Sequence, residues 1–153
     1  MNPSQDLYVE LKADIAALAE PLFEFSAKCL RNRGNFLPHA AVLTAGGAIE
    51  LVMGLPDSSD RPMSSVEVLP ALHETLRTLA QKHPLSAIGV AENVSVTRGT
   101  EAPIEAIKVL FEHKRGLTIA LYHPFRKQFL RGYAFGETFS VPAAGEVNAW
   151  PVA

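Results

Sequence analysis

The chain has 153 residues, 48% of them hydrophobic and 20% charged, and its formal net charge is −2. This length suits a single domain over residues 1–153, and the near-neutral charge provides no field to attract nucleic acid or an anionic membrane, so we expect neither as a partner. The single cysteine, Cys29, excludes an intrachain disulfide, and no apolar run approaches the about 20 residues that span a bilayer, so we expect a cytoplasmic protein.

The first predicted element is a helix, because apolar residues recur every three or four positions from residue 7 to residue 29. Pro21 interrupts this stripe, and a proline inside a helix removes one hydrogen bond and clashes with the preceding turn. We therefore expect a kink or break near Ala19-Glu20. The helix should end between Arg31 and Gly34, where glycine suits a left-handed cap.

Two short apolar runs, residues 40–44 and 48–53, are joined by Ala45-Gly46-Gly47 and predict a hairpin in the middle of a sheet. We expect a polar loop at residues 55–62. The capping-box pattern Ser64-x-x-Glu67 and a following leucine stripe then predict a second helix, with Pro70 in its first turn and its end at His83-Pro84.

Residues 87–98 predict a third strand, and residues 104–125 predict a long β-hairpin in which apolar residues alternate on both sides of Lys114-Arg115-Gly116. A three-residue loop with glycine in its last, left-handed position sets the register. This turn predicts four cross-strand pairs: His113 with Leu117, Phe111 with Ile119, Val109 with Leu121, and Ile107 with His123. One face of the hairpin is then an apolar wall with a histidine near each end.

The order is therefore helix, β-hairpin, helix, three further strands, and an extended aromatic-containing C-terminal tail from about residue 128. The connections are too short for parallel crossovers, so we predict an α+β fold with a mainly antiparallel sheet and helices packed on one face. The order resembles the profilin-like and roadblock-like folds, and its opening also resembles nucleoside deaminases. The zinc motif of the deaminases is absent, because Glu92 has no neighbouring ligand and the chain has one cysteine.

Two groups of residues are the candidates for chemistry. Glu92 lies in an apolar register, where burial would raise the pKa of its carboxyl and suit a general base; the alternative is a bulge that turns it outward. The hairpin supplies His113, His123 and Arg126 as candidate contacts for an anionic ligand, with Lys108 and Tyr122 opposite each other on the other face. The alternatives are a structural role for each histidine and solvated bases at a sheet edge. The two histidines lie near 20 Å apart by strand length, too far to share a metal.

No motif in the sequence indicates a particular reaction. We expect no metal and no cofactor, and we predict a non-catalytic module that binds a partner protein or a small anionic ligand. The alternative is a small, metal-independent, hydrolase- or isomerase-like enzyme that uses Glu92 with His123 and Arg126 in a pocket at the sheet end. We also predict a homodimer, because two helices leave apolar sheet surface to cover; the alternative is that the C-terminal tail covers it within one chain.

Overall fold

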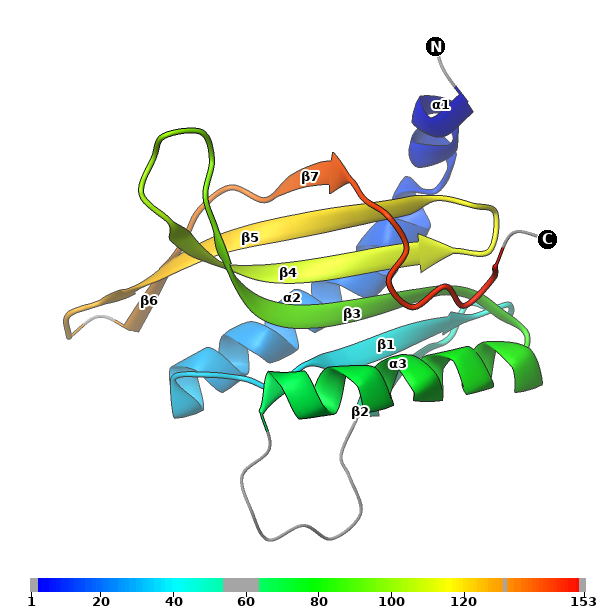
Figure 1. Cartoon of the computed structure of the whole chain (residues 1–153), viewed down its shortest axis with the longest axis horizontal. Coiled ribbons are helices and arrows are strands. Elements are labelled where there is room, and N and C mark those ends of the chain that lie inside the picture. The colour runs from blue at the N-terminus through cyan, green and yellow to red at the C-terminus, as the bar shows by residue number, and fades with distance from the viewer. Residues whose placement is uncertain (1–2, 54–63, 131, 152–153) are drawn as a thin grey trace, which may run out of the picture.

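The computed structural model describes residues 3–53, 64–130 and 132–151, and it confirms the α+β class and the order helix, hairpin, helix and three strands, while the predicted tail contains two additional short strands (Figure 1). The predicted polar loop at 55–62 lies outside the described residues. The elements are α1 (Pro3–Glu10), α2 (Lys12–Arg33), β1 (His39–Thr44), β2 (Ile49–Met53), α3 (Ser65–Lys82), β3 (Leu85–Val96), β4 (Ile104–His113), β5 (Thr118–Gln128), β6 (Gly132–Phe135) and β7 (Phe139–Pro142).

The sheet is antiparallel at every pairing, in the order β2-β1-β3-β4-β5-β6, with β7 also paired to β5. The first hairpin therefore does not lie wholly in the middle of the sheet. After α3 the chain returns beside β1, so that β1 is internal and β2 is the end strand.

The long hairpin forms in the predicted register. The backbone N–H of His113 donates to the carbonyl of Leu117 at 2.9 Å, and the next three pairs follow as counted from the turn. Gly116 has φ = 99°, the left-handed conformation that the turn requires and that a residue with a Cβ rarely adopts. Local turn chemistry and alternation were therefore sufficient to fix this part of the fold.

The two long helices cover opposite faces of the sheet, because successive residues of a strand point to opposite sides. Ala41 and Leu43 of β1 pack with α2, whereas Ala40 and Val42 pack with α3. Figure 1 shows α2 behind the sheet and α3 in front of it. We call these surfaces the α2 face and the α3 face. The prediction of helices on one face thus describes α2, and α3 lies on the other side.

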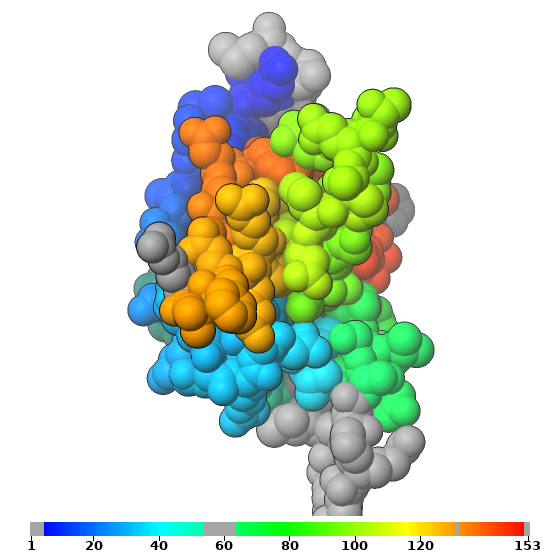
Figure 2. All heavy atoms as spheres, turned by 90° about the vertical axis from the view of Figure 1, so that its left-hand side faces the viewer, coloured from blue at the N-terminus to red at the C-terminus, as the bar shows by residue number. Residues whose placement is uncertain are grey.

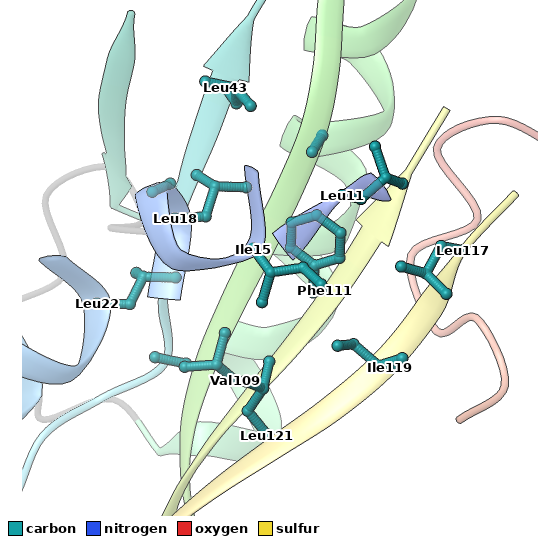
Figure 3. Packing of buried hydrophobic residues seen from close by; sticks show 13 residues of the cluster. Leu11, Ile15, Leu18, Leu22, Leu43, Val109, Phe111, Leu117, Ile119 and Leu121 are labelled. Atoms are coloured by element: carbon teal, nitrogen blue, oxygen red, sulfur yellow. The ribbon is translucent and has the colours of Figure 1, made fainter. Parts of the chain in front are cut away.

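The core of the α2 face centres on Phe111, which is fully buried (Figure 3). Leucine and isoleucine side chains of α2 and of the residue before it meet β4 and β5 there: Ile15, Leu18 and Leu22 of α2 and Leu11 at its N-cap lie against Val109, Ile119 and Leu121. The helix approaches the sheet closely at Gly89 of β3, where an added Cβ would lie 2.8 Å from Leu22 Cδ1. Glycine at this position is what allows α2 to settle onto the strands.

The N-terminal helix breaks at Leu11 rather than near Ala19-Glu20. Leu11 has φ = −98° and ψ = 10° and is itself buried in the core, whereas Pro21 lies inside an uninterrupted α2. The predicted cap is confirmed, with Gly34 at φ = 76° and its N–H donating to the carbonyl of Leu30. In α3, helix begins at Ser65, so Pro70 lies beyond the first turn.

The C-terminal tail runs back over the α3 face (Figure 1). Val147 and Ala149 are buried against residues of β1, β3 and α3, with Trp150 packed beside them. Within one chain, the tail therefore covers surface that had suggested a second subunit.

Candidate functional site

His113 joins the end of β4 to the start of α2. Its Nε2 lies 3.0 Å from Asp14 Oδ2, and its Nδ1 accepts from the backbone N–H of Arg115 at 3.1 Å. These partners assign the proton to Nε2, which donates to the carboxylate. The side chain is only 3% exposed. A second pair, Arg115 with Glu10 at 2.7 Å, ties the same turn to α1. His113 is thus occupied by contacts within the chain.

His123 lies at the opposite end of the hairpin in a stack of rings. Its ring is parallel to Phe135 of β6 at 5.0 Å and tilted against Phe23 of α2 at 5.1 Å. Nδ1 lies 2.8 Å from Thr138 Oγ1. Burial among these rings lowers the pKa of the imidazole. Figure 2 views this end of the molecule, where the β5–β6 hairpin (orange) lies against the C-terminal end of α2 (blue to cyan).

Glu92 is in regular strand, without the bulge that was the alternative. It pairs with Lys108, and both lie on the α3 face. Burial raises the pKa of the Glu92 carboxyl, and Lys108 opposes this effect. Lys108 Nζ also lies 2.7 Å from Glu146 Oε2 of the tail, and, against the effect of burial, the negative charges of Glu146 and Glu92 both raise the pKa of the ammonium.

The structure does not bring Glu92, His123 and Arg126 together. Lys108 pairs with Tyr122, as predicted, which places Glu92, Lys108 and Tyr122 in one row on the α3 face. His123 is the next residue along β5 and therefore lies on the α2 face. Arg126 returns to the α3 face but lies four residues from Tyr122, or about 13 Å along the strand. Among the described residues, none of the cavities beside α1, at Arg126 and at β1 is lined by more than one of these side chains.

A buried serine–histidine pair escaped the sequence reasoning. His39, at the start of β1, is fully buried; its Nε2 lies 3.1 Å from Ser26 Oγ and its Nδ1 lies 2.9 Å from the carbonyl of Leu37. Ser26 Oγ also donates to the carbonyl of Leu22 at 2.8 Å. When the neutral imidazole donates its Nδ1–H to the carbonyl of Leu37, its Nε2 is an acceptor. The Ser26 hydroxyl has one proton, so Nε2 and the carbonyl of Leu22 compete to accept it.

This pair has the atoms of a nucleophile and its base, but its setting is structural. Neither residue lines any of the three cavities described for this molecule. Phe25 and Phe36 pack against the imidazole, and burial lowers its pKa. The pair connects α2 to β1. One sequence signal could have located Ser26. It follows Leu22 by four residues and therefore lies on the same apolar side of the predicted helix, where a serine is buried.

Glu112 is the second group that sequence reasoning missed. Although only 4% exposed, its carboxylate accepts backbone N–H groups from four consecutive tail residues. Glu146 and Val147 donate to Oε2 at 3.1 and 2.8 Å, and Asn148 and Ala149 donate to Oε1 at 2.9 and 3.4 Å. Arg77 of α3 donates to the carbonyl of Val147 at 3.0 Å. The tail is thus held on the α3 face by a buried charge. Its donors are main-chain groups, which leave no side-chain signature in the sequence.

A cavity of about 660 Å³ lies between α1, the β4–β5 turn and β7. Figure 1 shows these three segments meeting at one end of the molecule. The lining residues are Gln5, Tyr8, Val9, 116–119 and 140–143. Apolar side chains form most of this wall, and no charged side chain is among them. None of the predicted site residues lines it.

Arg126 lines a different hollow of about 280 Å³, beside Phe125 and Phe135. Among the described residues, no three His, Cys, Asp or Glu side chains group as metal ligands, and no helix is long and apolar enough to cross a bilayer. No protein-family model, curated protein or solved structure matches the chain.

Proposed function

We propose that this protein is a non-catalytic binding module that holds a small, largely apolar molecule in the cavity between α1, the β4–β5 turn and β7. The cavity carries the proposal. Its volume of about 660 Å³ falls within the range of about 300–1,000 Å³ that is typical of small-ligand sites. Sites of this kind combine apolar walls with a few polar groups that orient the ligand.

The lining indicates the class of ligand. Tyr8, Leu117 and Ile119 offer apolar surface, and Thr118 and Ser140 offer hydroxyl groups. A charged ligand group would find no counter-charge in this wall, and burying an unpaired charge is costly. We therefore propose an uncharged or mainly apolar ligand here rather than the anionic ligand expected at Arg126, whose hollow of about 280 Å³ is small for such a site.

The enzyme alternative required Glu92, His123 and Arg126 in one pocket. The strand register places Glu92 and His123 on opposite faces of the sheet. No described cavity is lined by Glu92 or His123, so the geometry favours binding over catalysis.

Two further proposals concern the setting of the protein. We propose the cytoplasm, because a chain with one cysteine, half-buried on α2, suits a reducing compartment. We also propose that the protein is a homodimer, with a second copy as its partner protein.

The ligand proposal is tested with Nile red, an uncharged dye whose fluorescence increases in apolar sites. We expect saturable binding by the parent protein. Val9 and Val141 line the cavity but are 57% and 39% exposed, so Val9→Glu and Val141→Glu should fold and weaken dye binding at least tenfold. Val66→Glu is the matched control, because Val66 is 82% exposed on α3, outside this cavity.

Three results would count against the proposal: no saturable binding by the parent, equal binding by the cavity variants, or an equal loss in Val66→Glu. Native mass spectrometry of the protein from cells provides an independent measurement. A bound small molecule that disappears in Val141→Glu and persists in Val66→Glu would support the assignment and give the ligand's mass.

A further inference from the structure

The outer edge of β2 is the feature that points to a partner. Among the described residues, β2 pairs with β1 alone and ends the sheet. An unpaired strand edge presents N–H and C=O groups that can accept another strand. The strand Ile49–Met53 contains one charged residue, Glu50, and lacks proline and lysine, which commonly protect such edges.

The side chains at this edge continue the α2-face core beyond the helix that covers it. Leu51 pairs with Ala41, and Met53 pairs with the buried His39, so both point to the α2 face. They are 51% and 46% exposed, whereas Ile49 is packed against the core. On the other face, Val52 packs against the α3-face cluster and Glu50 is exposed. The apolar surface of the α2 face therefore extends beyond the part of the sheet that α2 covers.

We infer that a second copy of this chain pairs its own β2 antiparallel with this edge, across a two-fold axis through Leu51. This inference rests on the proposed self-association and assigns its interface. Directly opposite residues in an antiparallel pair point to the same face of the sheet, and residues of one strand alternate between faces. When two identical strands pair across a two-fold axis, the axis must therefore pass through a residue and not between two residues. Centring on Leu51 pairs all five residues of each strand.

The same register suits the charges and the apolar groups. Leu51 faces Leu51 of the other copy, Ile49 faces Met53, and Glu50 faces Val52. Centring on Glu50 would set two carboxylates directly opposite each other, an arrangement that destabilises antiparallel pairs. The strand is thus complementary to itself in length and side-chain pattern, as a two-fold interface requires, and this register keeps the two Glu50 carboxylates from facing each other.

The extent of the contact indicates its strength. Stable interfaces bury about 1,200–2,000 Å² in total, and weak, transient ones bury less. A ribbon of two five-residue strands with its flanking apolar side chains belongs to the smaller class. We therefore expect a dimer that dissociates in the micromolar range.

Sedimentation velocity over 1–200 µM tests the inference. The parent protein should shift from 16.6 kDa towards twice that mass as concentration rises. Leu51→Lys places like charges opposite each other and should keep the chain monomeric throughout. Val66→Lys introduces the same charge at an exposed position on α3 and should behave like the parent.

A mixture provides the sharper test of register. Leu51→Lys and Leu51→Glu should each be monomeric alone, and together they should form a heterodimer, because opposite charges then meet at the axis. A parent that remains monomeric at every concentration would refute self-association itself. A parent dimer that is unaffected by Leu51→Lys, or a mixture that fails to associate while the parent does, would instead refute β2 as the interface.

Discussion

Replacing Glu112 with glutamine tests how the tail is held. The carboxylate accepts four backbone N–H groups, two at each oxygen. Glutamine keeps one acceptor oxygen and turns an amide N–H₂ towards the other two donors. If the oxygen stays with Glu146 and Val147, the N–H groups of Asn148 and Ala149 lose their partner.

The expected loss follows from these contacts. Hydrogen bonds to a charged group contribute about 1.5–3 kcal/mol each, neutral ones about 0.5–1.5, and a buried donor left unpaired costs about 1–3. Each of the two remaining bonds loses about 1–1.5 kcal/mol, and the orphaned buried donor of Ala149 adds about 1–3, so the free energy of unfolding should fall by about 3–6 kcal/mol. For a chain of this size that corresponds to a fall of about 6–24 °C in melting temperature.

Thermal unfolding gives the magnitude, and two local probes report the tail. Amides 146–149 should lose protection from hydrogen exchange, and emission from Trp150, the only tryptophan, should shift to the red. Glu105→Gln, an exposed charge-matched change on the same strand, should alter stability by less than about 0.5 kcal/mol. A Glu112→Gln protein with the parent's melting temperature and exchange pattern would show that this carboxylate does not hold the tail.

Two further changes address the α2 face. Phe111→Ala empties the centre of its core and should cost about 3–5 kcal/mol by urea unfolding, whereas Phe129→Ala, at a side chain 90% exposed, should cost little; equal effects would contradict the assigned core. Burial lowers the pKa of His39 from its ordinary 6.5, so the unfolded chain binds a proton at this histidine more readily than the folded protein does. The contribution of His39 to the free energy of unfolding is therefore fully present above about pH 6.5 and is lost as the pH falls below that value. His39→Gln should therefore reduce the difference in unfolding free energy between pH 7 and pH 5, and an unchanged difference would contradict the assignment.

The elements that sequence reasoning predicted best are those in which local chemistry and alternation agree. Gly116 determined the turn, the turn determined the register, and the register placed Phe111 at the centre of the core. The predicted position of the helix break was wrong, because contacts with residues far away in the sequence determine where the helix bends. Pro21 marks the expected break, yet the chain bends at Leu11, whose side chain is drawn into the core.

The structure separates the residues of the proposed enzyme pocket, and the predicted hairpin register already set His123 on the opposite face from Lys108 and Tyr122. Glu92 pairs with Lys108 and Lys108 with Tyr122, so one step along β5 moves His123 to the other face. A cluster of neighbours in sequence is thus divided between two sides of a sheet. Counting faces along the paired strands would have excluded a common pocket for these residues.

The way in which the polar side chains are used supports the proposed binding function. Glu112, Lys108 and His113 are engaged in holding the tail and the helices to the sheet. These contacts neutralise or satisfy the groups that a reaction would need. Two apolar features of the described residues remain accessible, the cavity beside α1 and the edge of β2. An apolar cavity selects ligands by shape and hydrophobicity, and an unpaired edge selects a strand, so both features favour recognition.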